Sequence, residues 1–210
     1  MTDNIRITVW SDYVCPFYYL EEPVYECLRQ NYREAVDVQW CAFELRPEPV
    51  PTLDPDGEYL HTVWNQTVYP MARARKMTLR LPPVQPRSRK ALELAEFARD
   101  HGRFGDTHRA LFKAFFEDGL NLADIDVLVE IGTAAGLDRA AVRKALEQDA
   151  YLARVIRDER EARGLSVTAV PTALVSAVDQ PLAEAEIISG AQPYEALNAA
   201  VARAIERQAR

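Results

Sequence analysis

The segment that decides the fold is IRITVWSDYVCPFYYL, residues 5–20. Its first six positions place Ile5, Ile7 and Val9 on one face, which is the alternation of a β-strand. A short loop follows, and a helical pattern begins at Cys15. The segment therefore predicts a strand, a tight loop and a helix that starts with a cysteine.

Cys15 is placed for chemistry. Free N–H groups at a helix start and the positive end of the helix dipole stabilise a thiolate, which is the form of cysteine that attacks disulfides. Pro16 suits the next position because the N–H that proline lacks would have had no partner there. A buried structural thiol is the alternative, and the strand-to-helix turn argues against it. Tyr18 occupies the position where a dithiol redox site would have its second cysteine.

The composition is that of an ordinary soluble protein. The chain has 210 residues, of which 48% are hydrophobic and 27% charged, so it can bury a substantial core. Its net charge of −7 argues against a general affinity for nucleic acid or an anionic membrane. No apolar run reaches the length of a membrane span, and residues 1–4 lead into the strand without a signal-peptide pattern. We therefore expect a cytoplasmic protein with no nucleic-acid or membrane partner.

The three cysteines, Cys15, Cys27 and Cys41, suit neither a disulfide framework nor a zinc site. One helix joining Cys15 and Cys27 would separate them by roughly 18 Å, whereas a disulfide needs Cα atoms about 4.4–6.8 Å apart. Cys41 lies in an apolar run, and we expect it to fill space as a small hydrophobic residue. No metal site is expected.

A second strand is expected over residues 36–43, where the alternation returns. Strand, helix and strand at this spacing predict two parallel neighbours joined by a right-handed crossover. Pro23 lies inside the helical pattern and is expected to kink or divide the helix. Residues 46–87 form a proline-rich connection with a helix expected near residues 57–76, and a connection of this length usually covers something.

The sequence pattern predicts a block of helices in the middle of the chain. Ser88 is expected to cap the first of them, and Phe112, Phe115 and Phe116 are expected in the core. The three histidines, His61, His101 and His108, are not spaced as catalytic or metal-binding partners, and we expect them on the surface or in packing roles. Trp64 and Tyr69 are candidates to line a pocket over Cys15. The expected helices cover residues 88–102, 106–118, 124–135 and 138–147.

The last part of the chain returns to a mixed pattern. A helix, a strand entered through a proline, a hairpin partner and a closing helix are expected over residues 150–163, 166–175, 184–188 and from 193 onward. Without the block, the order β-α-β, α, β-β-α is that of the thioredoxin fold. We therefore predict an α/β protein in which residues 1–46 and 150–210 form a thioredoxin-like domain and residues 47–149 form a large all-helical insertion.

Four segments resemble the DsbA-like thioredoxin-fold proteins. Within that family the resemblance is to the FrnE-like subgroup, which includes relatives of 2-hydroxychromene-2-carboxylate isomerase and of kappa-class glutathione transferases. The segments occur in the expected order and span nearly the whole chain. They are SDYVCP, WCAFELRP, TAVPT and ISGAQPY, at residues 11–16, 40–47, 168–172 and 188–194.

The resemblance implies a substrate site around the cysteine. In the family the bond before the third strand's proline is cis and faces the cysteine, and the backbone of the preceding residue pairs with bound peptide or glutathione. Carried to this sequence, Val170 and Pro171 bind substrate together with Pro16 and Phe17. The alternative is that Pro171 only starts an edge strand.

Tyr18 is where the chain departs from the family. FrnE-like oxidoreductases usually have a cysteine there, which resolves the mixed disulfide, and tyrosine cannot do this. Its phenol is expected either to donate a hydrogen bond to the thiolate or simply to pack. Asp12, as an anion near the sulfur, would raise the pKa of the thiol, and it either caps the helix start or relays protons. The candidate catalytic set is Cys15, Tyr18 and Asp12.

The resemblance implies a thiol–disulfide oxidoreductase in which Cys15 acts alone and an outside thiol completes the exchange. No tightly bound cofactor is expected, although glutathione or another small thiol fits this role, and the substrate is a small thiol or disulfide or a protein disulfide. A homodimer is compatible with the sequence.

Two alternatives remain open. One is a glutathione-dependent isomerase or transferase of the kappa-class type, and the other is a redox-inactive binding protein on the same fold. In the isomerase relatives an acidic residue after the fourth strand holds the amino end of glutathione, where this chain has Gly190, Ala191 and Gln192. That difference weakens the isomerase alternative.

Overall fold

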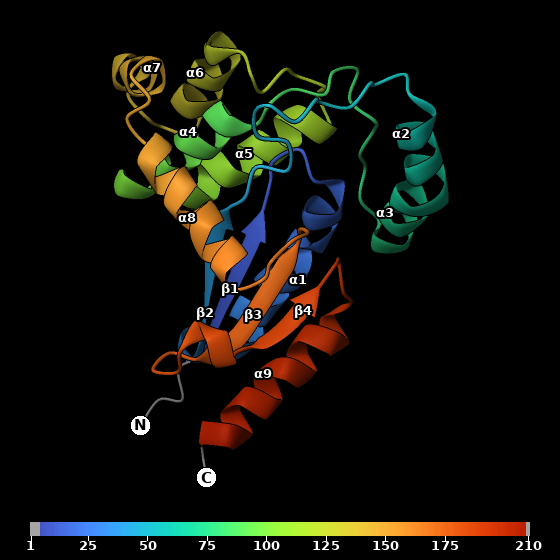
Figure 1. The fold of residues 1–210 in the computed structure, drawn as a ribbon, viewed down its shortest axis with the longest axis vertical. Helices are drawn as coiled ribbons and strands as arrows, with labels where there is room; N and C mark the ends of the chain where they lie inside the picture. The colour runs from blue at the N-terminus through green and yellow to red at the C-terminus, as the bar shows by residue number, and fades with distance from the viewer. Residues whose placement is uncertain (1–4, 209–210) are drawn as a thin grey trace.

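A mixed four-stranded sheet occupies one half of the molecule in the computed structural model, which describes residues 5–208 (Figure 1). The spatial order is β2-β1-β3-β4. Strands β1 and β2 are parallel, β3 is antiparallel to β1, and β4 is antiparallel to β3. This is the sheet of the predicted thioredoxin fold. The strands are β1 (Ile5–Ser11), β2 (Val36–Ala42), β3 (Thr172–Ala177) and β4 (Glu186–Ser189).

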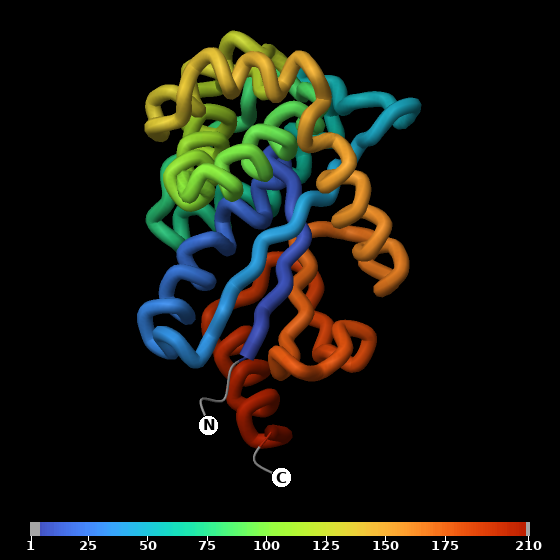
Figure 2. Tube along the Cα trace, turned by 90° about the vertical axis from the view of Figure 1, so that its left-hand side faces the viewer, coloured from blue at the N-terminus to red at the C-terminus, as the bar shows by residue number. Residues whose placement is uncertain are grey.

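Helices cover both faces of the sheet because the strands alternate their side chains between them. The face that carries Ile7 and Val9 packs in one core with α1 (Pro16–Tyr32) and α9 (Tyr194–Gln208). The opposite face carries Trp10, which packs in a smaller cluster with α8 (Leu152–Gly164). Strand β1 begins and α9 ends at the same end of the molecule (Figure 2).

A block of four helices stands over the other end of the sheet (Figure 1). Asp124 and Asp138 begin two of these helices by accepting hydrogen bonds from the backbone N–H groups of Asp126 and Ala141, each at 2.8 Å. The three phenylalanines expected in the core are buried, and one hydrophobic core runs from the sheet into the block. The helices are α4 (Arg89–Asp100), α5 (Phe104–Phe116), α6 (Ile125–Ala134) and α7 (Arg139–Glu147).

Residues 58–75 form an arm beside the block (Figure 1). The arm consists of α2 (Glu58–Val63), a π-helical turn (Trp64–Val68) and α3 (Tyr69–Arg75). The helix expected near residues 57–76 is therefore confirmed in this form. At the end of the arm the Arg75 guanidinium donates hydrogen bonds to the carbonyls of Leu20 in α1 and Gln192 before α9, which ties the arm to the sheet half of the molecule.

Three local predictions need correction. Pro23 was expected to kink or divide its helix, and division is excluded because α1 runs as one helix from Pro16 to Tyr32. Ser88 precedes α4 but makes no capping hydrogen bond, since its backbone is already helical. The third strand begins at Thr172 rather than at residue 166, because a turn at residues 165–166 and a bend at residues 169–171 come before it.

Candidate active site

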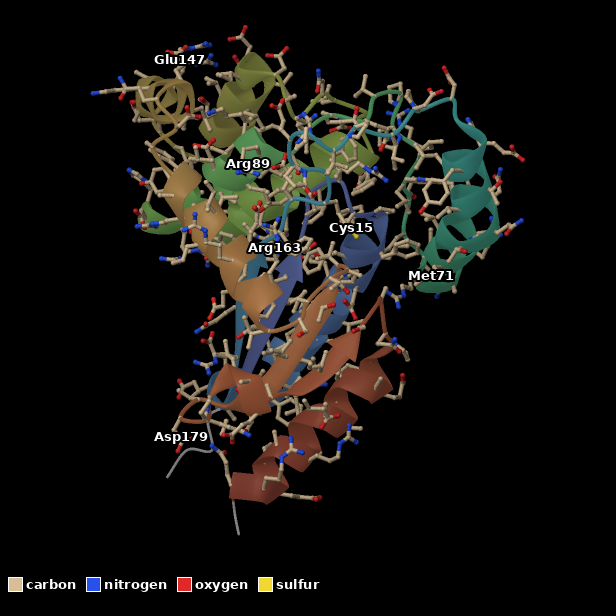
Figure 3. The ribbon with its side chains drawn as sticks, viewed as in Figure 1. Cys15, Met71, Arg89, Glu147, Arg163 and Asp179 are labelled. Carbon is tan, nitrogen blue, oxygen red and sulfur yellow. The ribbon has the colours of Figure 1, made fainter. Side chains whose placement is uncertain are left out.

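Cys15 lies where the sheet half of the molecule, the helical block and the arm meet. Figure 3 shows it at the start of α1, between the helical block and the arm that carries Met71. The turn after β1 is closed by a hydrogen bond from the Cys15 N–H to the Asp12 carbonyl at 3.0 Å, and Pro16 follows at the first helical position. The strand–loop–helix order of the sequence thus places the sulfur at the predicted helix start.

The structure brings Cys15 together with the Val170–Pro171 segment. The Val170–Pro171 peptide bond is cis, and the Cys15 Sγ donates a hydrogen bond to the Val170 carbonyl at 3.5 Å. Pro171 precedes β3, which pairs with the other side of β1, so the central pairing of the sheet holds these two distant segments side by side.

A pocket of about 250 Å³ opens beside the sulfur. Cys15, Pro16, Phe17 and Val170 line one side of it, so four of the predicted site residues share one cavity. The expectation that Trp64 lines a pocket over the cysteine is confirmed. Tyr69 is not part of this lining and faces a neighbouring hollow instead, because its hydroxyl accepts a hydrogen bond from the Leu81 N–H at 3.2 Å. 

The Cys15 thiol is protonated in the resting protein. Its residue is only 2% exposed, and this burial raises the pKa of the thiol to about 12. The backbone N–H groups of Tyr18 and Phe17 lower the pKa, as the helix-start argument predicts, but burial outweighs them and the Asp12 charge adds to the rise. The prediction of a standing thiolate is therefore wrong. The thiol proton is donated to the Val170 carbonyl.

The Tyr18 phenol points away from the sulfur into the block. Its hydroxyl lies 3.3 Å from the His108 Nε2, and the Nδ1 of the same ring lies 2.8 Å from the Tyr13 hydroxyl. The ring also stacks on Phe112. Of the two roles expected for Tyr18, packing is the one observed. Its backbone N–H lies beside the Cys15 sulfur, whereas its phenol lies against His108 in the block.

His108 takes the packing role expected for the histidines. Its ring is buried among the aromatic residues of the block, and burial lowers the pKa of His108 to about 3. The imidazole is therefore neutral, with one ring nitrogen donating and the other accepting. No local pattern predicts the contact between His108 and Tyr18, since 90 residues separate them.

Asp12 is buried beneath the site and joins two loops. Its carboxylate accepts hydrogen bonds from the Leu45 N–H at 2.8 Å and from the Val14 N–H at 3.3 Å. It does not cap α1, because Cys15 itself stands at the N-cap position. Burial raises the pKa of Asp12 to about 6, although the Leu45 N–H acts in the opposite direction. The carboxylate thus fixes the loop that presents the cysteine.

The other two cysteines lie outside this pocket. Cys27 is exposed on α1, and Cys41 is half-buried on β2 against the cluster that α8 covers. Within residues 5–208, no group of three or more histidine, cysteine, aspartate or glutamate side chains is arranged to hold a metal ion. No helix in the same part of the chain combines the length and apolar character needed to cross a membrane.

Glu21 is a site residue that the sequence reasoning missed. Its carboxylate is buried on α1, where it accepts hydrogen bonds from the Gln192 N–H at 2.8 Å and from the Tyr25 hydroxyl at 3.0 Å. Burial raises the pKa of Glu21 to about 7. A signal was present, because Glu21 falls in helical register with the buried Tyr18, Tyr25 and Leu28.

Comparison with known proteins assigns the family. Residues 6–202 match the model of the DSBA-like thioredoxin domain. The chain belongs to this family. The uncharacterized protein YwbO of Bacillus subtilis (strain 168) is 33% identical over 179 residues, which cover 82% of this chain and 87% of YwbO.

Two solved structures share the fold. The probable DsbA oxidoreductase SCO1869 from Streptomyces coelicolor is 28% identical, with a TM-score of 0.78 over 96% of this chain and 90% of that one. A 2-hydroxychromene-2-carboxylate isomerase is 18% identical, with a TM-score of 0.75 over 97% of this chain and 98% of that one. The second likeness shows the fold alone. The fold therefore carries both redox and isomerase sites, and the residues around Cys15 must decide between them.

Proposed function

We propose that this protein is a cytoplasmic, FrnE-like thiol–disulfide oxidoreductase in which Cys15 is the sole catalytic thiol. The observation that carries the proposal is the position of its sulfur. The sulfur lies at the start of α1, against the Val170 carbonyl, on the wall of a pocket large enough for a small molecule. Membership of a family with a DsbA oxidoreductase at 28% identity supports the same reaction class.

The exchange has two steps that balance in atoms and electrons. Cys15 loses its proton and attacks one sulfur of a substrate disulfide, so that a bond to Cys15 forms while the substrate S–S bond breaks and the leaving thiolate takes up a proton. An outside thiol, such as glutathione, then attacks the mixed disulfide. This step returns Cys15 as a thiol and joins the outside thiol to the remaining half of the substrate. One thiol is consumed and one is released.

An outside thiol is required because no second cysteine reaches the pocket. Tyr18 occupies the position of a resolving cysteine, and Cys27 and Cys41 do not line the cavity. The Val170 carbonyl is free to change partner once Cys15 is bound to sulfur. It can then accept a hydrogen bond from the substrate, which is the role that the family resemblance gives to this backbone.

Replacing each cysteine in turn tests the proposal. We expect Cys15→Ala to abolish turnover of a small disulfide such as 2-hydroxyethyl disulfide with glutathione, while Cys27→Ala and Cys41→Ala keep it. Intact-mass measurement of the Cys27→Ser, Cys41→Ser protein after incubation with glutathione disulfide should show one bound glutathione, which is absent when Cys15→Ala is added. Turnover that survives in Cys15→Ala, or that is lost in either other variant, contradicts the assignment.

A second candidate is a glutathione-dependent isomerase or transferase. The aromatic lining of the pocket and the structural likeness to a 2-hydroxychromene-2-carboxylate isomerase favour it. Calorimetric titration with reduced glutathione separates the candidates. The isomerase needs a saturable complex, whereas exchange needs only a transient encounter.

A third candidate is a binding protein that has lost redox turnover. The buried, protonated state of Cys15 favours it. The absence of a mixed disulfide at Cys15 in the Cys27→Ser, Cys41→Ser protein after prolonged exposure to glutathione disulfide at pH 8.5 would select this candidate.

A further inference from the structure

The Cys15 pocket has apolar walls and an apolar mouth. Trp64 from the arm and Phe115 from the block contribute aromatic rings to it. At its rim, Leu45 and Tyr59 are 38% and 64% exposed, and both are among the few large apolar side chains that the surface leaves open. Exposed apolar groups that continue into a cavity mark a site for an apolar ligand.

The polar part of the pocket is positive. Arg46 and Gln85 line it, and no aspartate or glutamate does. The Arg46 guanidinium donates one hydrogen bond, to the Pro51 carbonyl at 3.1 Å, and makes no ion pair with any carboxylate in residues 5–208. A guanidinium has five N–H donors, so most of its hydrogen-bonding capacity is unused.

Two other arginines near Arg46 do have a carboxylate partner. Arg87 pairs with Glu48 at 3.3 Å, and Arg89 donates to Glu44 at 2.6 Å. Arg46 comes from the same part of the chain and lines both the Cys15 pocket and an adjoining hollow that holds Asp12 and Glu44, yet it pairs with neither acid. The protein as a whole carries a net charge of −7, so attraction of an anion here depends on local positive groups, and Arg46 is the arginine that lines the pocket.

We propose that the pocket takes small aromatic or apolar disulfides that carry a carboxylate, and that Arg46 binds the carboxylate. The planar fork of arginine matches a carboxylate with two parallel hydrogen bonds. The apolar body of the substrate lies against Trp64 and Phe115, and its disulfide reaches Cys15. A volume of about 250 Å³ is at the small end of ligand sites, which favours a single substituted ring over a folded protein. The inference rests on the exchange function proposed above.

Two aromatic disulfides that differ in the carboxylate test the inference. The probes are 5,5′-dithiobis(2-nitrobenzoate), with a carboxylate on each ring, and 4,4′-dithiodipyridine, with none. Both release a coloured thiol when they react. The background is Cys27→Ser with Cys41→Ser, so that Cys15 is the sole thiol. Each rate constant is divided by the rate constant of free glutathione with the same probe. This normalisation corrects for the different intrinsic reactivities of the two probes.

Arg46→Met is the decisive variant, and Arg160→Met is its matched control. Arg160 is exposed on α8 and does not line the Cys15 pocket. We expect Arg46→Met to slow the carboxylated probe by about tenfold or more, since a charged hydrogen bond contributes roughly 1.5–3 kcal/mol and 1.4 kcal/mol is tenfold. The rate with dithiodipyridine should stay within about twofold in both variants, because that probe has no group for Arg46 to bind.

The outcomes separate this inference from the function on which it rests. Equal slowing of both probes in Arg46→Met would mean that Arg46 only shapes the loop, and no change with either probe would mean that it binds no carboxylate. Both results overturn the inference and leave Cys15 exchange standing. A peptide disulfide that reacts faster than the carboxylated probe overturns the assignment to small molecules. If neither probe modifies Cys15 in the parent protein, exchange itself fails and the inference fails with it.

Discussion

At the scale of single residues, the Cys15 sulfur is subject to two opposed influences. The N–H groups of Phe17 and Tyr18 favour the thiolate, whereas burial and the Asp12 charge favour the thiol. With a pKa of about 12, about one molecule in 10⁵ carries the thiolate at pH 7. Reaction therefore needs the proton to leave as substrate enters, and the Val170 carbonyl that holds it is not a base.

The pH dependence of alkylation reports this balance directly. In the Cys27→Ser, Cys41→Ser background, we expect the rate of Cys15 alkylation by iodoacetamide to rise steadily from pH 7 to 10.5. A free cysteine peptide, with an ordinary pKa of about 8.5, should level off above about pH 9.5. Peptide mapping confirms the modified residue. A plateau for Cys15 below pH 8 would show that the helix start outweighs burial after all.

Asp12→Asn should make Cys15 more reactive. Removing the Asp12 charge removes one cause of the raised Cys15 pKa, so a larger fraction of thiolate and faster alkylation are expected at pH 8. The pKa of Asp12 is itself raised to about 6, so wild-type Asp12 becomes neutral below that pH and the advantage of the variant should fade there. A rate ratio that stays constant from pH 5 to 8 would mean that Asp12 acts only by holding the loop.

At the scale of elements, α1 does more than present the cysteine. Glu21, one and a half turns further along, joins α1 to the segment before α9, and Arg75 at the end of the arm contacts both. The carboxylate is buried, so its charged form costs free energy that the folded protein must offset. Glu21 thus ties α1 to the segment before α9, and Arg75 ties the arm to both of them.

Glu21→Gln should flatten the pH dependence of stability. The folded-state pKa of Glu21 is raised from 4.5 to about 7, so its contribution to stability is fully present below pH 4.5 and is lost as the pH rises through 7. This rise corresponds to about 3 kcal/mol at most. Urea unfolding at pH 5, 6.5 and 8 should show a smaller loss of unfolding free energy in the variant than in the wild type. Parallel curves for the two proteins would contradict the assignment.

The sequence predicted the elements well because their signals are local. The alternation from Ile5 to Val9 and the spacing to the second strand sufficed for a parallel pair, and Cys15 followed as the start of a helix. The burial of Cys15 was missed because it depends on the arm, which starts more than 40 residues further along. The choice between the two roles expected for Tyr18 could not be made from the sequence, because its partner, His108, lies in the block.

At the scale of the whole molecule, the pocket exists only because three parts meet. The sheet half contributes Cys15 and Val170, the arm contributes Trp64, and the block contributes Phe115 and Phe116. These parts share one continuous hydrophobic core. The division into a thioredoxin-like domain and an insertion at residues 47–149 thus describes the order of the chain, and we predict that the two parts unfold together.

Phe112→Ala tests whether the two parts form one cooperative unit. Phe112 comes from the block and is fully buried, where it stacks on Tyr18 and Tyr19 of the sheet half and packs at a tilt against Tyr13. We expect its truncation to lower the unfolding free energy by about 3–5 kcal/mol while the transition stays single. Urea curves followed by tryptophan fluorescence and by far-UV circular dichroism should coincide, because every helix unfolds with the sheet.

The matched control for that substitution is Leu120→Ala, which removes an apolar side chain that is 41% exposed just after α5. Its cost should stay below about 1 kcal/mol, because most of the side chain is not transferred from water on folding. Two separated transitions in Phe112→Ala would show that the block and the sheet half unfold independently. In that case the pocket would be an interface between two units, and its shape would depend on how they dock rather than on a shared core.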